Sequence, residues 1–192
     1  MAAATSLGVL NFQEKIQGGV RPNLFEVSLE FPTGVDAAVD SVAYLCKSAS
    51  LPATTVGTVE LPFRGRVIKV PGDRTFESWT ATFYNTDSWE LRSAFEKWIS
   101  VTNAVDANVS ESSLENVLQQ VTISQMDKFS GDKTAKVIRE YKLFKAFPVS
   151  VSQISVAFDN NDSYEEFDVE FAYQYFTSTG GQGKNESTEI VG

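Results

Sequence analysis

Three carboxylates occupy alternate positions near the end of the 192-residue chain, in the segment YEEFDVEFAYQYF at 164–176. Glu166, Asp168 and Glu170 are residue types that bind cations or exchange protons, and Glu165 lies beside them. Alternate side chains of an extended strand point in parallel, however, and do not converge on one ion. The pattern therefore indicates either a solvated strand face or a patch that acts through its electric field, and it argues against a metal or acid–base site.

Other reactive residue types are scarce. The sequence contains no His, which removes the usual general base, a common zinc ligand and the partner of Ser or Cys nucleophiles. Cys46 lies in the apolar segment VAYLCKSASL, which is typical of a buried structural thiol. The tail sequence GGQGK lacks the first glycine and the final Ser or Thr of a phosphate-binding loop, because Ser178 and Asn185 stand there. We expect no enzyme activity, no cofactor and no metal.

Charge is distributed unevenly along the chain. The net charge of −9 argues against a general nucleic-acid-binding surface, since binding to phosphates is driven by Lys and Arg. Residues 158–192 hold eight acids and one base, whereas residues 55–74 hold four bases, Arg64, Arg66, Lys69 and Arg74, against two acids, Glu60 and Asp73. The basic segment is either a plain exposed hairpin or one half of a head-to-tail contact between copies of the chain.

The elements that carry these residues are mostly strands. Alternating or β-branched runs predict strands at 23–31, 42–52, 75–85, 120–127, 136–147, 150–158 and 164–176, and a long hairpin at 55–74. In the strand at 75–85, Trp79, Ala81 and Phe83 share one side. In the last strand, Phe167, Val169, Phe171, Tyr173 and Tyr175 form the face opposite the carboxylates.

One segment changes to helical periodicity. DSWELRSAFEKWISV at 87–101 places Leu91, Phe95 and Trp98 on one stripe, and Asp87 with Glu90 forms an N-terminal capping pattern. Residues 103–116 are a polar surface excursion with a helical turn near 114–119, residues 1–22 an N-terminal arm, and residues 180–192 a polar tail. We predict a single domain, 1–192, of the mainly β class: two packed antiparallel sheets in a small β-barrel or sandwich with one flanking α-helix.

A longer stretch resembles a known family. The run SLPATTVGTVELPFRGRVIKVPGDRTFESWTATFYNTDSWELRSAFEKWI resembles the tail tube proteins of contractile-tailed phages of the T-even type. The order of features is the same: Leu-Pro, a hairpin with Arg-Gly-Arg, a Pro-Gly-Asp-Arg-Thr-Phe strand and a Trp-bearing helix. GGVRPNLFEVSLEFP and FPVSVSQISVAF also resemble that family.

The resemblance implies a function as well as a fold. It implies a virion protein, with the fold shared by the inner tubes of type VI secretion systems, whose hexameric rings stack into the conduit for DNA inside a contractile sheath. The implied partners are other copies of the chain, the sheath protein, baseplate and tail terminator proteins, and a tape-measure protein in the lumen. DNA would pass without specific binding, no membrane would be involved, and assembly would occur in the host cytoplasm.

The resemblance also implies roles for particular residues. Arg64, Gly65 and Arg66 would lie in a hairpin that stacks on the neighbouring ring, together with Lys69 and Arg74, and Pro71, Gly72 and Asp73 would form its return turn. Leu91, Phe95 and Trp98 would pack the helix on the barrel. That Glu166, Asp168 and Glu170 line the lumen is an inference from strand alternation alone.

Two alternatives remain at this point. The first is a baseplate paralogue that initiates the tube and shares the fold. The second is a β-barrel protein that binds a small ligand or glycan, with Trp79 and Tyr84 as a stacking platform.

Overall fold

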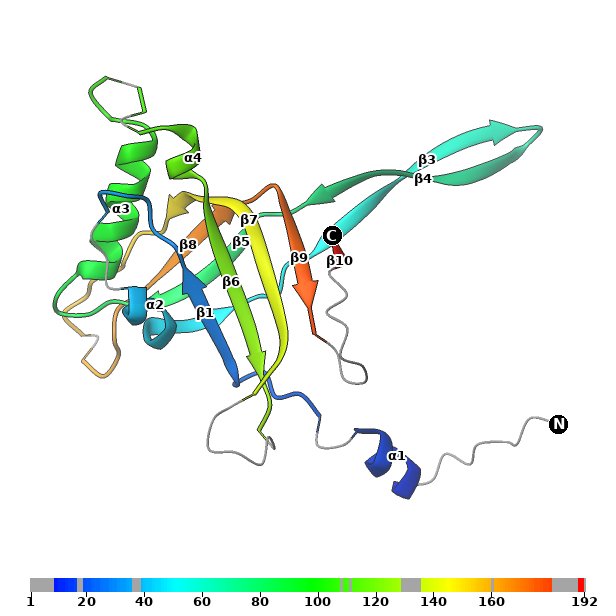
Figure 1. Cartoon of the computed structure of the whole chain (residues 1–192), viewed down its shortest axis with the longest axis horizontal. Helices are drawn as coiled ribbons and strands as arrows, with labels where there is room; N and C mark the ends of the chain where they lie inside the picture. The colour runs from blue at the N-terminus through cyan, green and yellow to red at the C-terminus, as the bar shows by residue number, and fades with distance from the viewer. Residues whose placement is uncertain are drawn as a thin grey trace.

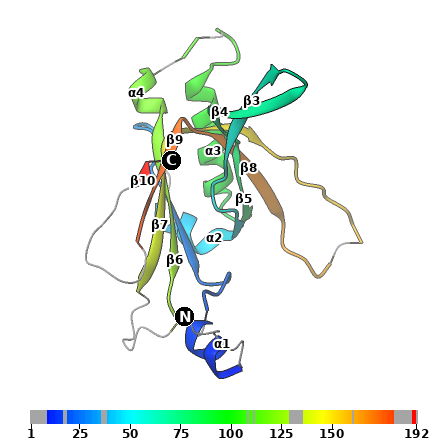
Figure 2. The same cartoon turned by 90° about the vertical axis from the view of Figure 1, so that its right-hand side faces the viewer.

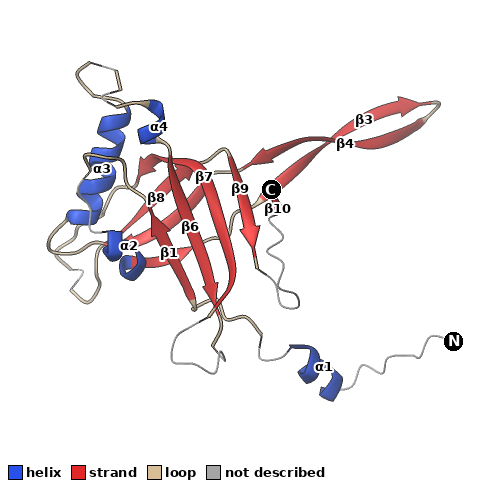
Figure 3. Cartoon of the chain, viewed as in Figure 1, coloured by secondary structure: helices blue, strands red, loops and turns tan. Residues whose placement is uncertain are grey.

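The computed structural model of the chain describes residues 9–16, 19–35, 39–107, 109–110, 112–128, 136–159, 161–180 and 190–191. Strands predominate among them, and helices α2, α3 and α4 lie together on one side of the strands (Figures 1 and 3). In chain order the elements are α1 (Val9–Ile16), β1 (Phe25–Leu29), α2 (Val39–Leu45), β2 (Cys46–Ala49), β3 (Thr54–Phe63), β4 (Arg66–Phe76), β5 (Trp79–Tyr84), α3 (Glu90–Thr102), α4 (Leu114–Val117), β6 (Gln119–Met126), β7 (Val137–Val151), β8 (Glu166–Ala172), β9 (Tyr175–Thr179) and β10 (Ile190–Val191).

The body consists of two antiparallel sheets that share one long strand. Sheet A pairs β1 with β6, β6 with β7, β7 with β9 and β9 with β10. Sheet B pairs β7 with β8, β8 with β5 and β5 with β2. In the described part of the chain, β1 and β2 end the strand order without pairing with each other, so the sheets form a sandwich that is not closed into a barrel. The predicted mainly β fold of two packed antiparallel sheets is confirmed.

Strand β7 passes from one sheet into the other. Its first part, to Phe144, pairs with β9, and its last part, from Phe147, pairs with β8. Between them, Lys145 has a φ of 55°, a left-handed conformation that is uncommon outside glycine. The partner segment is interrupted opposite this point, where Gln174 donates its backbone N–H to the Phe144 carbonyl at 3.1 Å. Strand β7 and the segment paired with it, β8 and β9, therefore bend together at this point.

This bend corrects the sequence prediction for the last strand. Residues 164–176 do not form one strand, because β8 ends at Ala172 and β9 begins at Tyr175. The alternation changes phase across the break, so that Phe176 is buried in the core while Tyr175 stacks on Phe144 with ring centroids 4.9 Å apart. A period-2 pattern cannot reveal such a break when aromatic residues occupy both sides of it.

The core lies between the sheets and under α3. Trp79, Ala81 and Phe83 of β5 and Phe167, Val169 and Phe171 of β8 are buried from sheet B, and residues of β1, β6 and β7 are buried from sheet A. Helix α3 covers this core with four buried residues, Leu91, Ala94, Phe95 and Trp98. Phe95 contacts the rings of Phe83, Phe167 and Phe171 at centroid distances of 5.4–6.3 Å.

The start of α3 differs from the prediction. The N-cap residue is Trp89, in the left-handed region with a φ of 57°, and its side chain makes no capping hydrogen bond. The predicted Asp87–Glu90 capping pattern therefore does not form. Instead, Thr86 and Ser88 share a side-chain hydrogen bond of 3.1 Å, and the turn before the helix closes through the Trp89 N–H and the Thr86 carbonyl at 2.9 Å.

Two other predicted strands are wrong in part. The segment 42–52 begins as helix α2 and becomes strand only at Cys46. The segment 150–158 contributes Ser150 and Val151 to the end of β7 and then continues as a loop. Both segments contain β-branched and aromatic residues, which favour strands. Both also lie where the chain leaves a sheet, and residue propensities do not show where a sheet ends. Residues 129–135, which connect the predicted strands at 120–127 and 136–147, and most of the tail at 180–192 lie outside the described residues.

Candidate assembly surfaces

The predicted long hairpin is present as a two-stranded ribbon that leaves the body. Strands β3 and β4 pair with each other and with no other strand in the described part of the chain, and they extend far beyond the two sheets (Figure 1). Every residue of β3 is exposed, as is nearly all of β4. The base is anchored by Phe76, whose ring lies 6.0 Å from that of Tyr173 and 5.9 Å from that of Phe176.

Arg64 and Gly65 form the tip of the hairpin. Phe63 pairs with Arg66, so the loop has two residues, Arg64 with a φ of 46° and Gly65 with a φ of 78°. Positive φ at both loop positions is the requirement of the tight turn that matches the natural twist of paired strands. The sequence RGR therefore places one arginine in the turn and a second one at the start of β4.

Pro71, Gly72 and Asp73 do not form the return turn that the family resemblance implies. They lie within β4, where the register shifts between the pairs Val56–Arg74 and Thr58–Pro71 and leaves Gly57 opposite the Gly72–Asp73 bulge. A Cβ atom on Gly72 would lie 3.2 Å from the Gly57 carbonyl oxygen, so the two strands approach closely only because of these glycines. Pro-Gly-Asp commonly marks a turn, but here it marks a bulge.

One face of the hairpin is apolar. Cross-strand pairs share a face, and the pairs Val59–Val70 and Leu61–Ile68 alternate with the pair Glu60–Lys69. Phe63, two residues beyond Leu61, continues the apolar side and is 61% exposed. We call Val59, Leu61, Phe63, Ile68 and Val70 the apolar stripe. The charge count of residues 55–74 did not reveal it, although the alternation in VELPF and RVIKV could have done so.

The charged residues of the hairpin differ in their surroundings. Lys69 Nζ lies 3.4 Å from Glu60 Oε1 on the face opposite the apolar stripe. The Arg64 guanidinium lies 5.4 Å from the centre of the Phe63 ring. Within the described residues, neither Arg64 nor Arg66 has an acidic partner. The tip therefore presents two cations next to an exposed aromatic ring.

The carboxylates of β8 lie on the outer face of sheet B. Each is held by a side chain of a neighbouring strand or loop: Ser78 Oγ donates to Glu170 Oε1 at 2.5 Å, Thr82 Oγ1 donates to Asp168 Oδ1 at 2.7 Å, and Lys47 Nζ contacts Glu166 Oε2 at 2.5 Å. We call Glu166, Asp168 and Glu170 the acidic row. The three side chains are fixed in parallel, in agreement with the expectation for alternate strand positions, and they do not converge on a common point.

The acidic row is partly neutralised at one end. The hydrogen bond to Glu166, more than the nearby negative charges, raises the pKa of Lys47 above its ordinary value, so Lys47 stays cationic at neutral pH. Asp168 and Glu170 receive neutral hydroxyl donors, which leave their negative charges uncompensated. The outer face of sheet B therefore keeps a negative field that is strongest away from Glu166.

Trp79 is not available for ligand stacking. Its side chain is 1% exposed, and its indole N–H donates to the Ser50 carbonyl at 2.6 Å. The alternative of a glycan-binding platform that uses Trp79 is therefore wrong. Cys46 donates weakly to the Ser48 carbonyl at 3.7 Å, and burial raises the pKa of its thiol to about 12, so it is a structural and unreactive thiol at neutral pH.

Among the described residues, no three or more His, Cys, Asp or Glu side chains are grouped so that they could hold a metal ion. None of the helices in the described ranges has the length and apolar composition needed to cross a membrane.

The amino-acid sequence matches a known protein family. A model of the phage tail tube protein family matches residues 20–179. The chain is 27% identical over 156 residues to the tail tube protein gp19 of Enterobacteria phage T4, covering 81% of this chain and 90% of the relative. It is 26% identical over 159 residues to the tail tube protein of Serratia phage KSP90, covering 81% of this chain and 87% of the relative.

Solved structures share the fold. A chain in the tube-terminating cap of the anti-feeding prophage superposes with a TM-score of 0.60 at 18% identity, covering 84% of this chain and 91% of that one. A chain in the sheath–tube complex of the extracellular contractile injection system PVC gives a TM-score of 0.55 at 16% identity, covering 88% and 97%. A crystal structure of an Hcp protein gives 0.51 at 12% identity, covering 88% and 96%.

Proposed function

Because the chain belongs to the phage tail tube protein family, as the match over residues 20–179 establishes, we propose that it is the repeating subunit of the tube in a contractile phage tail. Six copies form a ring, the rings stack, and the lumen of the stack conducts DNA. Membership of this family makes the chain a structural tail tube protein of the virion. The relatives are structural proteins, and the chain needs no catalytic residue for this task.

The exposed hairpin of β3 and β4 is the observation that most strongly supports this proposal. A two-stranded ribbon with an exposed apolar stripe is marginally stable alone and exposes surface that water disfavours. Val59, Leu61, Phe63, Ile68 and Val70 have no partner surface in the described part of the same chain, since all five are exposed. A neighbouring subunit that covers the stripe would stabilise both the ribbon and the assembly. We infer that the hairpin is the inter-ring contact, with Arg64, Gly65 and Arg66 at its tip and Lys69, Asp73 and Arg74 along β4.

The acidic row supports a lumen-facing position for the outer face of sheet B. DNA carries one negative charge per phosphate, and a conduit must not retain it. Glu166, Asp168 and Glu170 are held in fixed positions by their own chain and therefore repel phosphates without rearranging. Among the described strands, β2 pairs only with β5 and leaves its other side open, so pairing with a neighbouring copy would extend the same surface around a ring.

The partners follow from the same arrangement. Other copies of the chain would bind at the hairpin and at the sheet edges, and the sheath protein would surround the tube. Baseplate and tail terminator proteins would contact the two ends of the tube, a tape-measure protein would occupy the lumen before DNA, and assembly would occur in the host cytoplasm. The baseplate tube-initiator paralogue remains the nearest alternative, since it would share the fold.

Electron microscopy of the purified chain tests the proposal directly. We expect hexameric rings and tubes of uniform diameter, with growth that increases as protein concentration rises. A protein that stays monomeric across a wide range of concentration and salt would contradict it. Caps or single rings that never elongate would instead favour the tube-initiator paralogue.

A further inference from the structure

We propose that the hairpin tip of one copy binds the loop between β7 and β8 of the next copy in the tube. In the described part of the chain, this β7–β8 loop comprises residues 152–159 and 161–165. The proposal rests on the proposed function and adds the surface that receives the hairpin.

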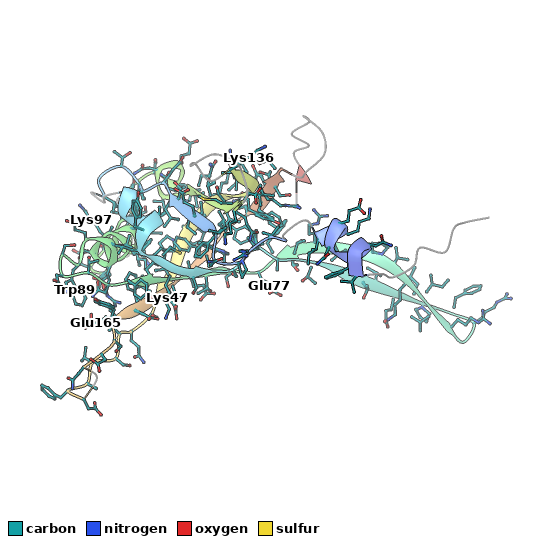
Figure 4. The ribbon with its side chains drawn as sticks, turned by 90° about the horizontal axis from the view of Figure 1, so that it is seen from below. Lys47, Glu77, Trp89, Lys97, Lys136 and Glu165 are labelled. Atoms are coloured by element: carbon teal, nitrogen blue, oxygen red, sulfur yellow. The ribbon has the colours of Figure 1, made fainter. Side chains whose placement is uncertain are left out.

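The two surfaces lie at opposite ends of the molecule. The hairpin extends from one end of the body, and the β7–β8 loop protrudes from the other, next to the labelled Glu165 (Figure 4). The loop also stands clear of both sheets when the molecule is turned (Figure 2). A head-to-tail contact joins two different patches of the same chain, and patches at opposite ends allow the contact to repeat without limit.

The charges of the two surfaces are complementary. Asp159 and Asp162 are exposed on the loop, and neither has a hydrogen-bond or ion-pair partner among the described residues. The other acids of this region have partners in their own chain: the acidic row has those described above, and Glu165 accepts from Asn85 Nδ2 at 2.9 Å. Asp159 and Asp162 are therefore the acids that remain for Arg64 and Arg66.

The loop also exposes apolar surface that matches the apolar stripe. Val156, Phe158 and Tyr164 are large, exposed side chains, and Phe158 is fully accessible to water. Phe63 and the Arg64 guanidinium at the hairpin tip are suited to such a surface, because an aromatic ring buries a large apolar area and a guanidinium packs favourably on aromatic faces. Burial of Phe158 and Phe63 against each other would remove two exposed aromatic rings from water.

The base of the loop is held in place before binding. Arg92 of α3 donates from Nη1 to the Ser152 carbonyl at 3.1 Å, and the Asp168 N–H donates to Ser152 Oγ at 2.8 Å. At the other end of the loop, the rings of Tyr164 and Tyr84 lie 6.4 Å apart. A receiving surface that is anchored at both ends loses less conformational entropy on binding than a free loop.

Cysteine cross-linking tests the contact in assembled tubes. The double variant Arg64→Cys/Asp159→Cys, oxidised after assembly, should give a ladder of covalent multimers on a non-reducing gel. Each single variant and the mismatched pair Arg64→Cys/Lys97→Cys should not, because Lys97 is exposed on α3, away from the loop. Tubes that form normally but give no ladder beyond these controls would overturn the proposal and leave the tube function intact. Failure of the wild-type chain to form any ring or tube would contradict the tube function itself.

Charge exchange provides a second, independent readout. Arg64→Glu/Arg66→Glu and Asp159→Arg/Asp162→Arg should each reduce the extent of tube growth at least about tenfold, and the combination of all four should restore most of it. Lys97→Glu is the matched control and should have no effect. Circular dichroism of each variant checks that the fold is kept. A combined variant that assembles no better than either pair would also overturn the proposal.

Discussion

Lys47 Nζ on the edge strand β2 lies 2.5 Å from Glu166 Oε2 on β8 and 5.7 Å from the centre of the Tyr84 ring on β5. The ion pair therefore crosses the intervening strand and lies over its aromatic side chain. It ties the edge of sheet B to the end of the acidic row. Lys47 thus holds the edge strand β2 to sheet B and also reduces the negative charge of the outer face.

Removal of this pair should change how stability depends on pH. The hydrogen bond to Glu166 raises the pKa of Lys47 in the folded chain above its ordinary 10.5, so the folded chain holds this proton more tightly than the unfolded chain does. The stabilisation that this proton gives the folded chain is complete below pH 10.5, and it is lost as the pH rises through the pKa of Lys47 in the folded chain. Glu166→Gln should therefore be less stable than wild type at pH 8, and the difference should shrink at pH 11, measured by urea denaturation. An equal difference at both pH values would show that the pair does not act through this proton.

Reversal of the acidic row should affect DNA passage more than assembly. Glu166→Lys/Asp168→Lys/Glu170→Lys turns a repelling surface into one that attracts phosphates, so we expect intact tubes but a rate of DNA ejection at least about tenfold lower. Ejection is measured on purified virions triggered with receptor. The triple variant Glu90→Lys/Glu96→Lys/Glu115→Lys, which changes the net charge equally on the helical side, should eject normally. Normal ejection by the acidic-row variant would contradict the lumen assignment.

Gly180 should tolerate no side chain. Its φ is +104°, and a Cβ atom there would collide with the Ile138 carbonyl oxygen and lie 3.1 Å from Arg139 Cα. Gly180→Ala should lower the free energy of unfolding by about 2–4 kcal/mol, from backbone strain and displaced β7 backbone. Gly34 is the matched control, since its φ is +95° but nothing lies within 4 Å of the added Cβ. Gly34→Ala should cost about 1 kcal/mol, and an equal loss in both variants would exclude the steric contribution.

Trp98 should be required for the packing of α3. Its indole N–H donates to the Val117 carbonyl at 3.0 Å, and its ring contacts Phe31 and Phe171 at 5.6 and 6.2 Å. Trp98→Phe keeps an aromatic ring but leaves the Val117 carbonyl unpaired, at a cost of about 1–3 kcal/mol. Trp98→Ala should cost about 3–5 kcal/mol. Thermal unfolding measures both, and Trp89→Phe, at a half-exposed position, should change stability little.

The strands and helix α3 could be predicted where a buried face follows a regular period. Phe25, Val27 and Leu29 of β1 lie on one side as the alternation of NLFEVSLEF predicted, with Val27 and Leu29 fully buried. The stripe of Leu91, Phe95 and Trp98 likewise lies in the core. In these segments local propensity and tertiary burial favour the same conformation.

The failures have a common physical cause. The bend at Lys145, the break before Tyr175 and the helical start of the segment at 42–52 depend on which strand lies alongside, and that information is not local. The family resemblance implies a turn at Pro71–Asp73, whereas the actual turn uses Arg64 and Gly65. The sequence patterns do not identify the apolar stripe or the exposed β7–β8 loop, because both expose apolar residues that take no part in the core. A hydrophobic pattern alone does not distinguish apolar residues that a partner would cover from apolar residues that are buried in their own chain.

The shared strand β7 has a mechanical consequence. Its 15 residues belong to both sheets, so the two layers are joined by covalent backbone as well as by side-chain packing. A force applied to sheet A therefore loads sheet B along a continuous chain, and the layers cannot slide past each other unless β7 breaks its hydrogen bonds on both sides of Lys145. In the proposed tube, whose bore would stay constant while the surrounding sheath contracts, the shared strand would make each subunit stiff.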